Sequence, residues 1–110
     1  MPDFIDEIRK AILRNDYIIS RHARARKNQR GITYKEIIQA ILQGEVVEQS
    51  PNASPYPKCL FMHPVRLDEP LYVACGYNAS QMNTVIITVH WFDPEKWTDW
   101  RTRIRRQSDE

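Results

Sequence analysis

The sequence predicts a single α+β domain in which N-terminal helices pack on a four-stranded antiparallel sheet, with one more helix near the C-terminus. Two observations carry this prediction. Three segments with helix caps or helical apolar spacing come first, and four segments rich in strand-forming residues follow them. The connections between successive strands are short, which favours antiparallel neighbours because a parallel pair needs a long crossover. A chain of 110 residues can build one modest core, so residues 1–110 are expected to form one domain.

Capping residues and apolar spacing predict the first and third helices. The first is expected over residues 3–14, with Asp3 as its N-cap. The third begins after Thr33, which is followed three residues later by Glu36 in a capping box, and Gly44 ends it. Each helix has one apolar face: Phe4, Ile5, Ile8, Ala11 and Ile12 in the first, and Ile37, Ile38, Ile41 and Leu42 in the third.

Four strands are expected after the third helix, over residues 45–49, 58–63, 71–77 and 84–92. The last of them, TVIITVHWF, is the strongest because β-branched and aromatic residues fill it. Strict alternation of side chains would place these residues together on one face: Thr84, Ile86, Thr88, His90 and Phe92. The apolar residues 17–19 are expected only to lead into the second helix.

A last helix is predicted over residues 94–106, after an Asp-Pro pair that starts at Asp93 and suits a helix start. Trp97, Trp100 and Ile104 fall on one face of it at helical spacing. The favoured interpretation is that the two tryptophans cover the sheet and the neighbouring arginines are solvated. The alternative is a docking surface, because tryptophan and arginine are the usual anchors of protein interfaces.

Composition and residue spacing argue against several functional classes. No apolar run approaches the ~18 residues of a membrane span, and the N-terminus has no signal-peptide core, so a cytoplasmic protein is expected. Cys59 and Cys75 lack metal-ligand spacing and are expected to be reduced core residues. The chain offers no paired histidine or cysteine motif and no glycine-rich phosphate loop. Neither a metal nor a cofactor is therefore expected.

The second helix, expected over residues 21–30, has an unusual composition. The stretch from Ser20 to Lys35 has no acidic residue and holds a large share of the chain's 16 lysines and arginines: Arg21, Arg24, Arg26, Lys27, Arg30 and Lys35. Its helix offers only Ala23 and Ala25 for packing, whereas a helix in a small domain usually carries an apolar stripe. A phosphate-bearing partner or an acidic protein partner would explain these charges. The alternative is that the basic face is simply solvated.

Histidines and cations in two segments could together cleave RNA without a metal ion. His22, Arg26 and Arg30 recur every four residues along one face of the basic helix. Thr88 and His90 share a face of the last predicted strand. Metal-independent cleavage needs a base for the 2′-hydroxyl, an acid for the leaving oxygen and cations for the phosphate. The two histidines and the nearby cations could supply these groups, although His90 also fits an ordinary half-exposed strand residue.

Several short motifs resemble the domain of unknown function 4258 family. They are Ser20-x-His22-Ala23, Arg26, the run Arg30-Gly31-Ile32-Thr33, the isoleucine-rich helix up to Gly44-Glu45, and the final Val-Ile-Ile-Thr88-Val strand. The resemblance covers residues 17–92 and leaves out the first and the last predicted helix. It implies membership of the barnase/RelE-like group of small RNase toxins, in which helices pack on a curved, four-stranded antiparallel sheet.

The resemblance also implies a function. Such a protein would be the toxin of a toxin–antitoxin pair, an endoribonuclease that cleaves RNA without a metal ion and is bound by a cognate antitoxin. The catalytic residues that it implies are His22, Arg26 and Arg30, with His90 as a further candidate. Additional contacts to RNA phosphates are expected from Arg21, Arg24, Lys27, Lys58 and Thr88. Two alternatives are a non-catalytic module that binds RNA or an acidic protein through the same helix, and a structural domain whose basic face is solvated.

Overall fold

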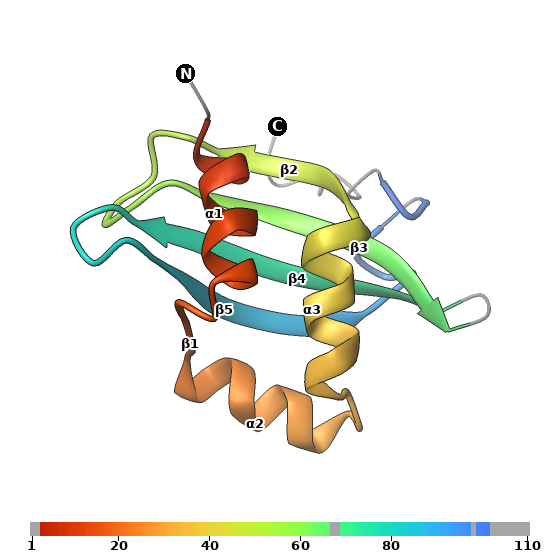
Figure 1. Cartoon of the computed structure of the whole chain (residues 1–110). Helices are drawn as coiled ribbons and strands as arrows, with labels where there is room; N and C mark the ends of the chain where they lie inside the picture. The colour runs from red at the N-terminus through yellow and green to blue at the C-terminus, as the bar shows by residue number, and fades with distance from the viewer. Residues whose placement is uncertain (1–2, 67–68, 98, 102–110) are drawn as a thin grey trace.

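The computed structural model describes residues 3–66, 69–97 and 99–101. Within these ranges the elements are α1 (Phe4–Leu13), β1 (Tyr17–Ile19), α2 (Arg21–Gln29), α3 (Tyr34–Gln43), β2 (Glu45–Ser50), β3 (Lys58–Arg66), β4 (Glu69–Asn78) and β5 (Asn83–Trp91). The strands form one sheet in the order β1-β5-β4-β3-β2. Figure 1 shows α1 and α3 across one face of this sheet, with α2 beyond its β5 side. The predicted α+β class is confirmed.

The predicted sheet of four antiparallel strands is wrong, because the described chain forms a mixed sheet of five strands. β1 pairs in parallel with β5, which places Tyr17 opposite Thr84 and Ile19 opposite Ile86, while the other neighbouring strands are antiparallel. A three-residue strand is too short to show a strand periodicity, so its pairing depends on a partner far along the chain. Thr84 also joins β5 to α1, since its buried hydroxyl donates to the backbone oxygen of Ile8 at 3.0 Å.

The predicted C-terminal helix does not form in the described part of residues 94–106, and residues 102–106 lie outside the description. The backbone N–H groups of Lys96 and Trp97 donate to the backbone oxygen of Asp93 at 2.9 and 3.1 Å, which makes a single turn. Trp97 is then 1% exposed and packs, with Trp100 beside it, against apolar residues of the sheet. The predicted contact of both tryptophans with the sheet is confirmed, and this contact competes with helical geometry in the segment.

The predicted caps of the first and third helices are confirmed. Asp3 accepts a hydrogen bond of 3.0 Å from a first-turn N–H of α1, and Thr33 and Glu36 form the capping box of α3. Gly31 follows α2 with a φ of +63°, the left-handed conformation expected at that position. Ala23 is the buried residue of α2, in line with its lack of an apolar stripe. In the part of the chain that the structure describes, no helix is both long and apolar enough to cross a membrane.

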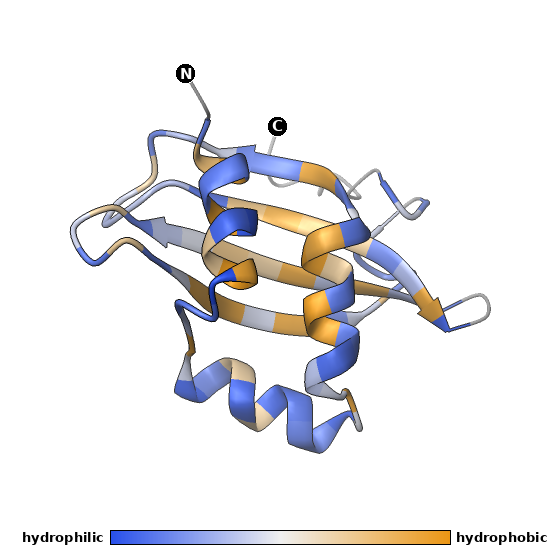
Figure 2. Ribbon diagram, viewed as in Figure 1, coloured by the Kyte–Doolittle hydropathy of each residue, from blue (hydrophilic) through white to orange (hydrophobic). Residues whose placement is uncertain are grey.

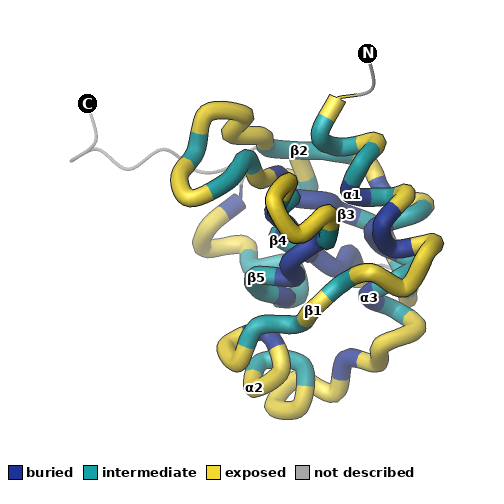
Figure 3. Tube along the Cα trace, turned by 60° about the vertical axis from the view of Figure 1, so that its left-hand side comes forward, coloured by how far each residue is buried: buried dark blue, intermediate teal, exposed yellow. Residues whose placement is uncertain are grey.

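The main core lies between the sheet and the pair of helices α1 and α3. Figure 2 shows hydrophobic residues along these two helices and the strands behind them, whereas α2 is hydrophilic. Figure 3 shows the same contrast as burial, with α2 mostly exposed. Fully buried residues of this core include Ile8, Ile37, Ile41, Phe61, Leu71, Val73, Ile86 and Val89. Cys59 and Cys75 lie opposite each other on β3 and β4 and are buried free thiols, as the sequence predicted.

One charged side chain, Arg9 of α1, joins the two core helices. Its Nε donates to the backbone oxygen of Ile41 at 2.9 Å and its guanidinium to that of Gly44 at 2.8 Å, at the C-terminal end of α3. Replacing Arg9 with alanine leaves these carbonyls without that donor and should lower the free energy of unfolding by about 1–3 kcal/mol. Urea unfolding measures this, with Lys10→Ala on the exposed side of the same helix as the control. Equal midpoints for the two variants would contradict the prediction.

Candidate functional site

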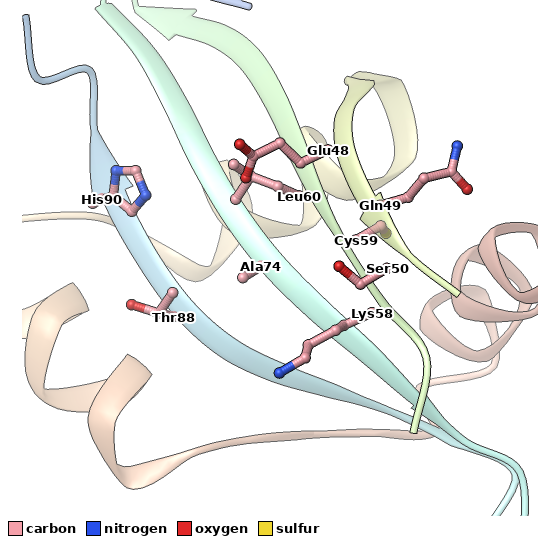
Figure 4. A pocket seen from close by; sticks show the side chains of 9 residues that line it. All are labelled: Glu48, Gln49, Ser50, Lys58, Cys59, Leu60, Ala74, Thr88 and His90. Atoms are coloured by element: carbon pink, nitrogen blue, oxygen red, sulfur yellow. The ribbon is translucent and has the colours of Figure 1, made fainter. Parts of the chain in front are cut away.

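A pocket of about 190 Å³ opens on the face of the sheet that α1 and α3 leave uncovered. Its lining comes from four neighbouring strands: Glu48, Gln49, Ser50, Lys58, Cys59, Leu60, Ala74, Thr88 and His90. Figure 4 shows Thr88 and His90 on one side of Ala74, with Lys58 and Glu48 across from them. Ala74 and, two residues later, Gly76 lie on this face of the central strand β4. Ala74 presents only a methyl group to the pocket, whereas the ring of Tyr56 occupies the space above Gly76.

A β-bulge in β5 decides which of its side chains face the pocket. β5 has one residue more than β4 between two successive pairs, and the extra residue is Ile87. Ile86 and Val89 therefore both face the core, whereas Thr88 and His90 line the pocket. The prediction that Thr88 and His90 share a face is confirmed. Grouping Ile86 with them is wrong, because strict alternation does not allow for the bulge.

The first turn of α2 brings His22 to the edge of this pocket. Nε2 of His22 lies 3.1 Å from Oγ1 of Thr88, within hydrogen-bond distance. The N-cap of α2 explains how the two meet. Oγ of Ser20 accepts from the N–H of Ala23 at 3.0 Å and donates to the backbone oxygen of Ile87 at 2.8 Å. The start of α2 is thus bonded to the bulge that orients Thr88.

The cations of α2 are spread around the helix. Successive helical residues are about 100° apart, so Arg26 lies about 40° from His22, whereas Arg24 lies about 160° away. Arg26 is half-buried, and Lys27 is on the far flank, where its Nζ lies 4.2 Å from the centre of the Tyr34 ring. The exposed cations between residues 20 and 35 are Arg21, Arg24, Arg30 and Lys35. Of the predicted site residues, Lys58, Thr88 and His90 line the pocket and His22 lies beside Thr88. The guanidinium of Arg26 instead donates to the side-chain oxygen of Gln29 at 3.5 Å, within the α2 region.

The other end of α2 is also anchored to the sheet. Nε1 of Trp91 donates to the backbone oxygen of Arg30 at 3.2 Å. The guanidinium of Arg66 lies 4.6 Å from the centre of the Trp91 ring, donates to the backbone oxygen of Gly31 at 2.8 Å, and pairs with Glu36 at 2.7 Å. The hydrogen bond from Arg66 holds the pKa of the Glu36 carboxyl below its ordinary value. Because both ends of α2 are held, its first turn keeps its place beside the pocket.

His90 is positioned by the residue beside it in the sheet. Its ring stacks on the ring of Tyr72 with centroids 5.1 Å apart and planes 6° apart, and its Nδ1 donates to the backbone oxygen of Trp91 at 3.1 Å. Tyr72 is fully buried and stacks in turn on Trp97, with centroids 4.8 Å apart. Residues two apart on a strand are about 6.6 Å apart, so His90 and Thr88 can contact one small ligand together.

Sequence reasoning missed three residues that shape this face: Glu48, Ser50 and Tyr72. Glu48 and Ser50 reach the pocket from β2, on the same side as Lys58 and across from His90 (Figure 4). A second bulge, at the position of Val47, shifts the alternation of β2, so its pattern in the sequence does not show which residues share a face. Only the register of β2 against β3 shows that Glu48 and Ser50 are on the pocket face.

The pocket lining combines the imidazole of His90, an ammonium group, hydroxyls and a carboxylate around an apolar floor, and the imidazole of His22 lies beside it at Thr88. Such a set can move protons to and from an anionic ligand. Burial raises the pKa of Cys59 to about 12 and that of Cys75 well above its ordinary value, so neither is a thiolate near neutral pH. Among the described residues, no group of three or more His, Cys, Asp or Glu side chains is arranged to hold a metal ion.

A family model matches about two thirds of the chain. Its description is Domain of unknown function (DUF4258), and the match covers residues 19–91. No curated protein and no solved structure matches the chain. The matched region includes α2, α3 and the strands β2 to β5, and therefore every residue that lines the pocket.

Proposed function

The chain belongs to the domain of unknown function 4258 family, and from that premise we propose that it is a toxin-like endoribonuclease, of the barnase/RelE-like group, that cleaves RNA without a metal ion. One observation carries the proposal. His22 of the basic helix lies 3.1 Å from Thr88, which lines the same pocket as His90 and Lys58. Proton-transfer groups and a cation for a phosphodiester therefore meet on one surface.

The proposed reaction uses these groups on an RNA phosphodiester held beside Thr88. One imidazole takes the proton of the 2′-hydroxyl, and the oxygen attacks the adjacent phosphorus. The other imidazole protonates the departing 5′-oxygen, so the products are a 2′,3′-cyclic phosphate and a free 5′-hydroxyl. His22 and His90 are the two imidazoles, and Lys58 offsets the charge of the phosphate oxygens. Arg26 and Arg30 bind the neighbouring phosphates of the strand, because a guanidinium fits phosphate oxygens.

The first experiment is cleavage of a mixed-sequence RNA by the purified protein in EDTA. We expect products ending in a 2′,3′-cyclic phosphate, and no cleavage of the same sequence as DNA, which lacks the attacking 2′-hydroxyl. RNA that is bound but not cut would contradict catalysis and support the non-catalytic binding module. Absence of both binding and cleavage would leave a protein partner as the explanation of the basic helix.

The phosphate contacts of α2 predict a change in salt dependence. Arg26→Ala and Arg30→Ala should each weaken RNA binding and reduce the slope of log affinity against log salt by about 0.7, because each removes one phosphate contact to a single strand. Filter binding between low and moderate salt measures the slope. Arg14→Ala is the matched control, since Arg14 pairs with Asp16 away from α2 and should leave the slope unchanged. An unchanged slope in both α2 variants would remove these arginines from the interface.

An acidic protein partner, such as the cognate antitoxin, is the second candidate, and the spread of the α2 cations favours it. Arg24 lies on the side of α2 opposite His22, and Lys27 lies beside Tyr34. An RNA strand in the pocket would not contact that side, but an acidic segment of another protein could. Arg24→Glu should then weaken capture of an acidic partner while RNA cleavage continues.

A further inference from the structure

We propose that Ser20 is a positioning residue: its hydroxyl ties the start of α2 to the bulge at Ile87 and thereby sets His22 against Thr88. The effect of Ser20 on the position of His22 is inferred from the geometry alone. Its consequence for catalysis rests, in addition, on the proposed function. Ser20 does not line the pocket, so it acts through His22 and Thr88.

Three hydrogen bonds make the connection. The backbone N–H of Ser20 donates to the backbone oxygen of Ile86 at 2.9 Å, which continues the pairing of β1 with β5. Oγ of Ser20 donates to the backbone oxygen of Ile87, the bulged residue, at 2.8 Å. The same Oγ accepts from the N–H of Ala23 at 3.0 Å and so begins α2. One side chain therefore links both segments that carry the His22–Thr88 pair.

The bulge explains why the link affects His22. Thr88 follows directly after Ile87, and the bulge turns its side chain to the pocket face. His22 follows Ser20 by two residues in the first helical turn. A shift of the Ile87 carbonyl relative to Ser20 therefore changes the 3.1 Å separation between Nε2 of His22 and Oγ1 of Thr88.

The chemistry of the side chain at position 20 allows the two links to be separated. A hydroxyl donates and accepts at once, so threonine can replace serine in both bonds. An ionised aspartate accepts from the helix N–H groups and is a good N-cap, but it has no proton for the Ile87 oxygen. Alanine makes neither bond. Ser20→Asp thus keeps the cap of α2 and removes the link to the bulge.

The test compares Ser20→Thr, Ser20→Asp and Ser20→Ala, with Thr33→Ala as the control that removes an equivalent N-cap from α3. For RNA cleavage in EDTA, we expect Ser20→Asp and Ser20→Ala to lower kcat by at least about tenfold with KM little changed, because a small misplacement of a catalytic group costs this much. Ser20→Thr should keep a kcat close to the native value, and Thr33→Ala should cleave RNA as the native protein does. Native kcat in Ser20→Asp would overturn the proposal.

A second readout uses the protein without RNA. Nitrogen NMR of the His22 imidazole reports its hydrogen bond to Thr88, and Thr88→Val supplies the spectrum of the broken bond. We expect Ser20→Asp to move the His22 signals toward those of Thr88→Val, while Thr33→Ala leaves them in place. Unmoved signals in Ser20→Asp would overturn the positioning role. If the native protein cleaves no RNA but the signals move, the proposed function fails and the positioning of His22 stands.

Discussion

Replacing His22 with alanine should lower the rate of RNA cleavage by about 10²- to 10⁴-fold, the usual contribution of a general acid or base. RNA affinity should change little, because the neighbouring cations remain. Nε2 of His22 is the atom that meets Thr88 at the edge of the pocket, so its loss removes one of the two proton-transfer groups of the proposed reaction. Single-turnover cleavage in EDTA measures the rate, and filter binding with a 2′-O-methyl RNA, which cannot be cleaved, measures the affinity.

His63→Ala is the matched control for His22→Ala. His63 is a half-buried histidine of β3 whose Nε2 lies 3.5 Å from the side-chain nitrogen of Gln39, and it does not line the pocket. The His63→Ala variant, purified in the same way, should cleave RNA as the native protein does. Equal cleavage by His22→Ala and His63→Ala would place the activity outside this pocket or in a contaminant.

Local signals in the sequence predict the helices well, because a helix cap involves residues only a few positions apart. The N-cap Asp3 of α1 and the capping box of Thr33 and Glu36 are present as expected. The lack of an apolar stripe in α2 also predicts its exposure at the side of the sheet. These features need no knowledge of the partner strands.

The errors concern structure that depends on distant residues. β1 becomes a strand because β5 offers it an edge, and its three residues carry no periodicity of their own. The segment after Asp93 has helical apolar spacing, yet burial of Trp97 against the sheet holds its described part in a single turn. In both places a contact with residues distant in the sequence determines the local structure.

The candidate site divides in the same way. Residue chemistry singled out His22 and His90, because the chain has only three histidines, and added Thr88 and Lys58 as groups that could act beside them. The distance between His22 and Thr88 depends on the bulge at Ile87 and on the hydrogen bond from the Ser20 hydroxyl to the backbone oxygen of that residue. No residue spacing in the sequence reveals either feature.

Tyr72 connects the pocket to the segment that follows β5. Its ring lies between those of His90 and Trp97, and its hydroxyl donates to the backbone oxygen of Trp100. The face of the sheet opposite α1 and α3 is therefore partly covered by a small second apolar cluster, which contains Leu60, Met62, Tyr72 and Trp97. The same ring that fills this cluster also supports a proposed catalytic histidine, so stability and activity should respond together when it is removed.

Replacing Tyr72 with alanine should lower the free energy of unfolding by about 3–5 kcal/mol, the usual cost of removing a large buried aromatic ring. Tyr72→Phe keeps the ring and loses only the hydroxyl bond, so it should cost about 1 kcal/mol. Urea unfolding followed by tryptophan fluorescence measures both. RNA cleavage by folded Tyr72→Phe should stay close to native, because the surface that supports His90 remains. A cost of Tyr72→Ala no larger than that of Tyr72→Phe would show that the stack of His90, Tyr72 and Trp97 does not hold this face together.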